Sequence, residues 1–426
     1  MTEKKASLPL TLAALLLFSG GLLDAQDLSN PMNDLLFKIA VFGPSDDIYI
    51  WWGHAGLVVE NMSTGYGRIY DWGIFSFSGG NFVRAYALND IRYRCGVSPA
   101  GIDIENYTDE DRDIIMYTLD LNSSQKRTIL DYADNNTLPE NCWYVYHQFG
   151  DNCSTRIRDL VDRGTGGQFR EYFEDAPGRF TLREHMRRFT WYSPFYDWFL
   201  AFLLGRSIDR DISMWEEMYL PVELGRNLID YSYIDDTGAR RKLVSNVEIV
   251  NKTKNRAAVL EAPRSQIPRA LATGLAIAAL LALVRLLRKK RPFAGRALMG
   301  ISHSAAGFAL GIAGSVLFFA SRVPERDYMR GNNNLLYANP LVLAVIPLGI
   351  IAALGVKFSP CAARCLRVWW RYVCAACVVS ALLNILPFLR QDNWPTLALV
   401  LPVALVLALP ERAGIDKKRV GGGYNS

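Results

Sequence analysis

Histidine is scarce in this sequence, which holds four among 426 residues. Residues 27–265 contain no set of residues spaced as metal ligands. The chain has no phosphate-cradling glycine loop and no dinucleotide-binding fingerprint, so we expect no metal and no cofactor. Residues 27 to about 265 also lack any apolar run long enough to cross a membrane. Rich in Tyr, Trp and Asp, they are long enough for a packed core, and we expect them to form one extracytoplasmic domain.

Long apolar runs are confined to the C-terminal part, where we expect about five transmembrane helices within residues 266–412. Each run approaches the roughly 20 residues that a spanning helix needs, although the first and the last are short. The runs cover residues 270–287, 297–321, 335–356, 369–389 and 394–409.

The first 25 residues have a basic start, an apolar run from Leu8 to Phe18 and then small residues. This layout is typical of a signal peptide cleaved after Ala25. Because no clean A-x-A box precedes Gln26, an uncleaved N-terminal anchor is the alternative.

Positive charge is concentrated in the links that follow the first and third apolar runs and in the tail of residues 413–426. The two opposite links are poorer in Lys and Arg. The positive-inside rule therefore predicts a cytoplasmic C-terminus and places residues 27–265 outside the cytoplasm. The formal net charge of +5 then reflects topology, and we expect no nucleic-acid partner.

The exported part contains Cys95, Cys142 and Cys153. An odd number leaves at least one thiol unpaired or bonded to another chain. If Cys95 pairs with Cys142, Cys153 is left over, but the sequence does not decide the pairing. The four cysteines between residues 361 and 377 fall in or beside an apolar run and are interpreted as packing residues.

Cys153 lies where a helix is expected to begin. Ile157, Leu160 and Val161 recur at helical spacing after it, and Asp151 and Asn152 before it are good N-cap residue types. Free backbone N–H groups and the positive end of the helix dipole favour a thiolate there. The alternative is a structural cysteine on a first turn that faces the core.

A thiol nucleophile needs a base, and His54 has the most suggestive context. In IYIWWGHAGLVVE the pattern alternates as in a strand, so that His54 and Gly56 share one face and the glycine leaves room for a substrate or another backbone. His147, close to Cys153 in sequence, is a competitor. His185 lies in a basic stretch and is expected at the surface, and His303 falls within an apolar run.

The third member of a Cys–His arrangement would orient the imidazole. After the turn signal STGYG, the segment RIYDWGIF is expected to return as the second strand of a hairpin. Either Asp71 or Tyr70 could then face His54. The choice depends on the hairpin register, which the sequence leaves open.

The segments GHAGLVVE, YDWGIF and YVYHQFGDNCSTRIRDLVD, followed by WFLAFLLGRSIDRDISMWEEMYLPVEL and NNNLLYANPLVL, resemble the bacterial Lnb family. The order of a strand-opening His before a helix-opening Cys is similar to circularly permuted papain-like enzymes of the NlpC/P60 superfamily, including the lecithin:retinol acyltransferase group. The resemblance implies an α+β permuted papain-like extracytoplasmic domain followed by the membrane helices. It also implies a place in the bacterial inner membrane, with the catalytic domain on the periplasmic side.

By this resemblance, Cys153 is the nucleophile and His54 the base of a lipoprotein N-acyltransferase, with the role of third member shared between Asp71 and Tyr70. The expected donor is a membrane phospholipid and the expected acceptor a diacylated lipoprotein. The substrate contacts expected on the chain are Gly56, Asn152, Arg156 and Asn339. The amides around Asn339 could instead only cap a helix. The alternative function is a periplasmic cysteine hydrolase, either a peptidoglycan endopeptidase or a phospholipase, that uses the same Cys and His.

Overall fold

The computed structural model describes residues 30–77, 82–87 and 90–410, so the predicted signal segment and C-terminal tail lie outside the described residues. The described chain divides into two compact units. The first runs to Arg179 and resumes over Ile212–Ala258, whereas the second comprises Phe180–Asp211 and the chain from Val259 onward. Residues 180–211 thus belong to the second unit. The predicted bounds of the extracytoplasmic domain, 27–265, and of the membrane domain, 266–412, stay a prediction.

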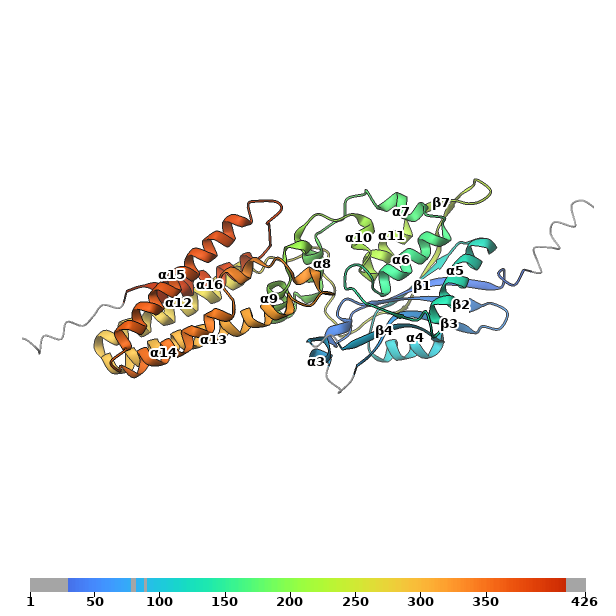
Figure 1. Ribbon diagram of the computed structural model, residues 1–426. Coiled ribbons are helices and arrows are strands. Elements are labelled where there is room, and N and C mark those ends of the chain that lie inside the picture. The colour runs from blue at the N-terminus through green and yellow to red at the C-terminus, as the bar shows by residue number, and fades with distance from the viewer. Residues whose placement is uncertain (1–29, 78–81, 88–89, 411–426) are drawn as a thin grey trace, which may run out of the picture. The chain divides into compact units, whose positions relative to one another are not determined.

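The first unit is built on an antiparallel sheet of seven strands in the order β6-β4-β3-β2-β1-β5-β9 (Figure 1). Its strands are β1 Leu35–Phe42, β2 His54–Asn61, β3 Gly67–Phe77, β4 Ile91–Pro99, β5 Ile114–Leu119, β6 Trp143–Tyr144 and β9 Val244–Asn251. Hairpin pairing places β2 between β1 and β3, so this strand is central and its ends are fixed by two neighbours.

Both faces of this sheet are covered, with α4 (Ala100–Asp109) on one and α5 (Ser123–Thr137) and α6 (Cys153–Gly164) on the other (Figure 1). Leu57 packs on the face of α6, whereas its neighbour Val58 packs on the face of α4. Burial of such a side chain contributes about 1.5–3 kcal/mol. Successive side chains of β2 therefore pack into two different hydrophobic cores, one on each face of the sheet.

The remaining elements of the first unit are short. They are η1 Ile48–Ile50, α3 Phe82–Ala87, α7 Gln168–Phe173, α10 Met214–Glu217, α11 Pro221–Ile229, β7 Ser232–Ile234 and β8 Arg240–Lys242. The predicted α+β class of this unit is confirmed.

The second unit is helical. Its elements are α8 Leu182–Thr190, α9 Pro194–Leu203, η2 Arg206–Asp209, α12 Ile267–Lys290, α13 Pro292–Ala320, η3 Asp327–Met329, η4 Asn333–Leu336, η5 Pro340–Ala344, α14 Val345–Leu354, α15 Ser359–Leu383 and α16 Trp394–Ala408. The helices α13 and α14 approach closely, because a Cβ at Gly300 would lie 2.5 Å from the Gly349 carbonyl oxygen. Small residues at such crossings are typical of membrane helices.

Four segments of the second unit are long and apolar enough to cross a membrane: Ile267–Lys290, Pro292–Ala320, Asn333–Leu354 and Ser359–Leu383. We predicted about five. The fifth apolar run forms α16, which has 15 residues and contains Pro402. A helix of that length spans about 22 Å, short of the ~30 Å hydrocarbon core.

Candidate active site

Cys153 is the first residue of α6, and its neighbours explain why the helix begins there. The Asn152 side-chain oxygen accepts a hydrogen bond from the Thr155 backbone N–H at 2.9 Å, and the Thr155 hydroxyl accepts one from the Asn152 N–H at 2.7 Å. This reciprocal pair is a capping box that satisfies donors with no partner inside the helix. On the following turns Ile157 and Leu160 are completely buried, so the helix start is fixed in place.

His54 is the first residue of β2, and its Nε2 lies 2.8 Å from Asp71 Oδ1. The register of β2 against β3 pairs Gly56 with Asp71 and Leu57 with Tyr70. Residues directly opposite in an antiparallel pair point to the same face, so Asp71 shares the face of His54 and Gly56. The structure therefore brings Asp71, and not Tyr70, to the imidazole.

Tyr70 lies on the opposite face of the sheet, in the core beneath α5 and α6. Its hydroxyl donates a hydrogen bond to the Asp134 carboxylate on α5. Tyr70 is fully buried there, and nothing in its surroundings connects it with the imidazole.

Gly56 makes the contact between Asp71 and His54 sterically possible. A Cβ at this position would lie 2.8 Å from Asp71 Oδ1 and 2.8 Å from Ile69 Cδ1. We expected the missing side chain to leave room for a substrate or another backbone. The structure fills that space with the Asp71 carboxylate and Ile69 instead.

The Cys153 thiol lies within hydrogen-bonding reach of His54, the Ala55 backbone N–H and the Tyr146 hydroxyl. Burial opposes ionisation, but the charge and hydrogen bond of His54, with the donors of Ala55 and Tyr146, lower the pKa of Cys153 below its ordinary value of 9.0. Because Nε2 of His54 is engaged by Asp71, Nδ1 is the ring nitrogen left for the sulfur.

The pKa of the His54 imidazole is shifted in the opposite direction, that is, upward. Burial alone would lower its pKa, but Tyr107 and Cys153, together with the hydrogen bonds to Asp71 and Cys153, raise the pKa of His54 well above 6.5. The ring also packs beside Phe42 and Tyr107, at centroid distances of 5.9 and 6.3 Å. A lowered thiol pKa beside a raised imidazole pKa favours a thiolate–imidazolium pair over the neutral pair.

Cys95 provides an internal comparison. It is also buried, but burial is the leading influence on it and raises the pKa of Cys95 to about 12. A buried thiol without an imidazole partner therefore stays protonated. Cys95 and Cys142 are neighbours across two strands, joined by a backbone hydrogen bond of 2.8 Å, and both are free thiols. Cys153 is free as well.

Tyr146 is a site residue that our sequence reasoning missed. Its ring stacks on Tyr93 at 4.5 Å, and it lies over Gly73, where an added Cβ would be 3.3 Å from the ring. Gly73 has a φ of 102° and sits at a bulge in β3. A signal was present in the clustered tyrosines of YVYHQF, but the sequence does not show that one of them reaches Cys153 over Gly73, which leaves room for its ring.

Two of the expected substrate contacts are engaged within the protein. The Asn152 amide donates to the carbonyl oxygens of Gln148 at 2.7 Å and Tyr219 at 3.0 Å, in addition to its capping role. Arg156 forms an ion pair with Asp151 and lies 4.5 Å over the Tyr144 ring. Neither is among the groups that lower the pKa of Cys153 most strongly. We assign both to the framework of the loop before α6.

The other histidines have separate environments. Nδ1 of His147 accepts hydrogen bonds from the backbone N–H groups of Gly150, at 2.9 Å, and Phe149, at 3.3 Å, in its own loop. His185 is fully buried beside Arg188, which corrects our expectation of a surface position. Nδ1 of His303 accepts a hydrogen bond from Trp370 in the helical unit.

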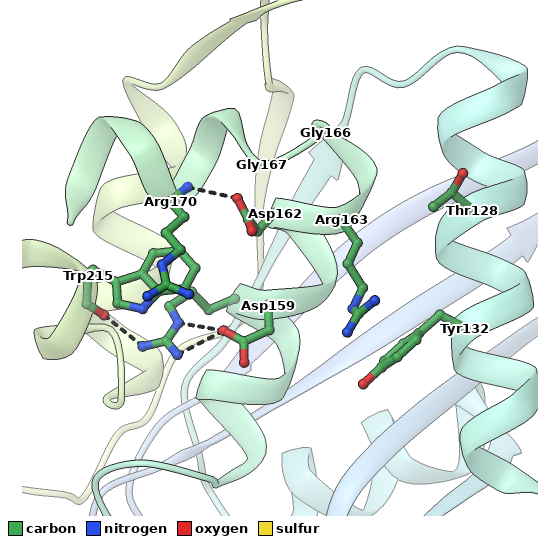
Figure 2. A pocket seen from close by; sticks show the side chains of 10 residues that line it. Thr128, Tyr132, Asp159, Asp162, Arg163, Gly166, Gly167, Arg170 and Trp215 are labelled. Atoms are coloured by element: carbon green, nitrogen blue, oxygen red, sulfur yellow. Dashed lines mark hydrogen bonds and ion pairs between the residues drawn. The ribbon is translucent and has the colours of Figure 1, made fainter.

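A cavity of about 590 Å³ in the first unit lies elsewhere, between α5 and the segment from α6 to α7 (Figure 2). Most of its charged side chains already have partners within the protein. Arg158 pairs with Asp159 at 2.8 Å and stacks 3.9 Å over Trp215, and Asp162 accepts a hydrogen bond from the Arg170 backbone (Figure 2). None of the thiol-site residues lines this cavity, so we assign it no part in the chemistry.

Asn339 lies in the helical unit and caps η5, because its side-chain oxygen accepts a hydrogen bond from the Leu341 N–H at 3.1 Å. Its amide also donates to the Leu335 carbonyl at 3.1 Å. Asn339 therefore occupies the helix-capping position that we gave as the alternative to a substrate contact. Within the described ranges, no group of three or more His, Cys, Asp or Glu is arranged to hold a metal ion.

Comparison with known proteins gives one match. Residues 29–187 match the family model described as the Lnb N-terminal periplasmic domain, a range that includes Cys153, His54 and Asp71. No curated protein and no solved structure matches the chain significantly. A periplasmic domain followed by four membrane-capable helices is typical of an inner-membrane protein. The N-terminal part of this chain thus matches the Lnb N-terminal periplasmic domain, which supports the assignment of the protein to the Lnb family.

Proposed function

We propose that this protein is a lipoprotein N-acyltransferase that moves a fatty acyl chain from a membrane phospholipid to the α-amine of a lipidated N-terminal cysteine. One observation carries the proposal: the Cys153 thiol, at the start of α6, lies within hydrogen-bonding reach of His54, whose Nε2 is held in turn 2.8 Å from Asp71 Oδ1. Nucleophile, base and orienting carboxylate in this order form a thiol-transfer site.

In the first half-reaction, His54 holds the proton of Cys153 and the thiolate attacks an ester carbonyl of the phospholipid. The C–O ester bond breaks, the imidazolium returns its proton to the leaving oxygen, and lysophospholipid departs from a thioester on Cys153. The Ala55 N–H and the free N–H groups at the start of α6 are suited to stabilise the oxyanion. One such donor is worth about 3 kcal/mol in comparable sites.

In the second half-reaction, the α-amine of the lipoprotein attacks the thioester carbonyl. His54 accepts the amine proton and the C–S bond breaks, so the Cys153 thiolate departs and the starting pair of thiolate and imidazolium is restored. The aromatic side chains of Tyr93, Phe75 and Tyr49 form a chain of ring contacts leading away from Tyr146, at centroid distances of 5.8 and 5.0 Å for the last two steps. These rings offer an apolar surface for an acyl chain.

The membrane helices support the same assignment, because donor and acceptor both reside in a bilayer. With the first unit in the periplasm, α12, which begins at Ile267 after that unit ends at Ala258, would enter the membrane from the periplasmic side. A cytoplasmic C-terminus then requires α16 to make a fifth crossing. Its short apolar length would be accommodated by local thinning of the bilayer.

The proposal is tested by the mass of lipoprotein N-terminal peptides from cells with and without this protein. Transfer predicts an acyl gain that is lost in Cys153→Ser and in His54→Ala. Cys365→Ser and His147→Ala are matched controls, because Cys365 is an exposed thiol in α15 and His147 binds its own loop. Both should retain the acyl gain.

Two outcomes would contradict the proposal. Release of free fatty acid or of a peptidoglycan fragment without any acyl gain would identify a cysteine hydrolase that uses the same residues. An acyl gain that survives in both Cys153→Ser and His54→Ala would show that the thiol site does not perform the reaction.

A further inference from the structure

The helical unit contains a cavity of about 740 Å³ formed by its own residues alone. Three arginines line it: Arg206 opens η2, and Arg322 and Arg330 lie in the connection between α13 and η4. The same cavity has an apolar side, made by Leu335, Leu336 and Leu383. Positively charged guanidinium groups and apolar leucine side chains therefore line the same cavity.

None of the three arginines forms an ion pair with a described residue, and no carboxylate lines the cavity. Arg322 lies 4.7 Å over the Phe318 ring, and Nη2 of Arg330 donates to the Pro324 carbonyl at 2.9 Å. Arg206 packs against Gly331, where an added Cβ would lie 3.2 Å from its Cζ. Most of their N–H donors remain available to an anion.

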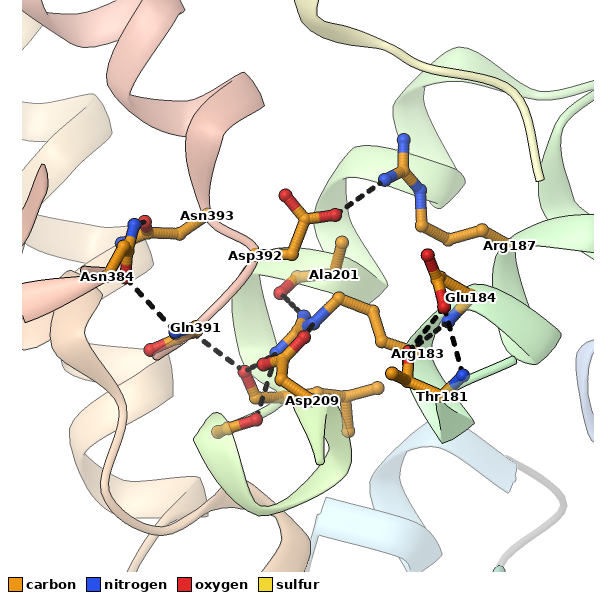
Figure 3. A network of polar contacts seen from close by, with 12 residues as sticks. Thr181, Arg183, Glu184, Arg187, Ala201, Asp209, Asn384, Gln391, Asp392 and Asn393 are labelled. Carbon is orange, nitrogen blue, oxygen red and sulfur yellow. Dashed lines mark hydrogen bonds and ion pairs between the residues drawn. The ribbon is translucent and has the colours of Figure 1, made fainter. Parts of the chain in front are cut away.

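Neighbouring arginines of the same unit behave differently (Figure 3). Arg183 is fully buried and binds Asp209 through two hydrogen bonds of 2.7 and 2.9 Å, and Arg187 donates to Asp392 at 3.1 Å (Figure 3). The fold thus supplies carboxylates where it buries arginine. At the cavity it leaves three like charges together, an arrangement that an anionic ligand would stabilise.

The cavity lies where membrane-length helices end. α13 ends at Ala320, two residues before Arg322, and α15 ends at Leu383. Phe319 and Leu382, adjacent to lining residues, are 68 % and 57 % exposed, as expected for side chains that face lipid. The positive groups therefore lie at the level of lipid head groups, and the leucines lead toward the acyl region.

We propose that this cavity binds the phosphate of a membrane phospholipid, with the guanidinium groups of Arg206, Arg322 and Arg330 around the phosphate and the leucines against the glycerol and upper acyl carbons. Three positive charges without a carboxylate favour a lipid with net negative charge over a zwitterionic one. The inference goes beyond the proposed function, because binding here requires neither Cys153 nor acyl transfer.

The test measures lipid binding to the full-length protein in detergent by native mass spectrometry, with phosphatidylglycerol as the probe. Diacylglycerol with the same chains lacks the phosphate, and inorganic phosphate lacks the chains. Phosphatidylglycerol is expected to bind at least tenfold more tightly than either. In Arg206→Gln/Arg322→Gln/Arg330→Gln, its affinity should fall about 100-fold, at roughly fivefold for each arginine near the head groups.

The matched control is Lys357→Gln/Arg364→Gln/Arg367→Gln, which removes the same charge from the start of α15 without touching the cavity. It should bind phosphatidylglycerol as the wild type does, and so should Cys153→Ser. If the triple cavity variant fails to fold, the single Arg322→Gln at an exposed side chain should still weaken binding about fivefold.

Unchanged affinity in the cavity variants, or an equal loss in the two triple variants, would overturn the proposal. Inorganic phosphate binding as tightly as the lipid would assign the site to a free anion instead. Lipid binding by this site in a protein without acyl transfer would contradict only the proposed function.

Discussion

Substitution of Gly56 by Ala separates two roles for this glycine: space for a substrate or space for Asp71. An added Cβ would meet Asp71 Oδ1 at 2.8 Å and Ile69 Cγ1 at 3.0 Å, tighter than real Cβ contacts. Because Gly56 lies in a central strand paired on both sides, the backbone has little freedom to withdraw. The carboxylate is the group that must move, which weakens its 2.8 Å hydrogen bond to His54.

The size of the expected effect follows from the free energy of the hydrogen bond between Asp71 and His54. A hydrogen bond to a charged group contributes about 1.5–3 kcal/mol, and 1.36 kcal/mol corresponds to a factor of ten. Partial loss should shift the equilibrium between thiolate and thiol at Cys153 by about tenfold toward the thiol. Overpacking should also lower the free energy of unfolding by about 1–3 kcal/mol.

The assay is the rate of alkylation of Cys153 by iodoacetamide between pH 5 and 9, which needs no lipid substrate. The Gly56→Ala profile should move to higher pH, because the pKa of Cys153 rises when its imidazolium partner is destabilised. Gly101→Ala is the control, since an added Cβ there meets nothing within 4 Å. It should leave the profile unchanged.

A specific result would refute this reasoning. If Gly56→Ala alkylates as the wild type does but loses acyl transfer, the glycine makes room for substrate and the contact with Asp71 is unimportant.

Three further predictions follow from the same structure. Asp71→Asn should lower acyl transfer at least tenfold, whereas Tyr70→Phe, on the opposite face, should retain it and lose about 1 kcal/mol of unfolding free energy in a denaturant titration. The pH midpoint for alkylation of wild-type Cys153 should lie below the ordinary value of 9.0, because its pKa is lowered, and the rate should fall as the pH drops through that midpoint and the thiolate is protonated; a midpoint at or above 9.0 would contradict the lowered pKa. Arg183→Met should lower the unfolding free energy of the helical unit by about 3–5 kcal/mol in detergent, since it leaves the buried Asp209 without its partner; an unchanged melting temperature would argue against the buried pair.

The resemblance to a known family implied the α+β class of the first unit, and local periodicity predicted the start of α6 at Cys153. The capping residue Asn152 and the apolar spacing of Ile157, Leu160 and Val161 are signals within one turn or two of the helix. The apolar C-terminal runs predicted membrane helices for the same reason, although the shortest run falls below a spanning length.

The sequence alone could not predict how segments distant along the chain pair with one another. Asp71 and Tyr70 are adjacent, and a shift of one residue between β2 and β3 would exchange their faces. The register is set by the packing of both faces of the sheet, so only the tertiary structure could choose Asp71. The same holds for Gly56, whose missing side chain is filled by a residue from the neighbouring strand.

The sequence by itself thus determined where α6 begins, that His54 lies on a strand, and which segments suit a membrane, because these depend on residues close together along the chain. Only the tertiary structure decided which carboxylate orients the imidazole, that Tyr146 reaches the sulfur, and that His185 is buried in the helical unit. Those contacts join residues far apart in sequence, and their geometry follows from strand register and core packing, which no local pattern records.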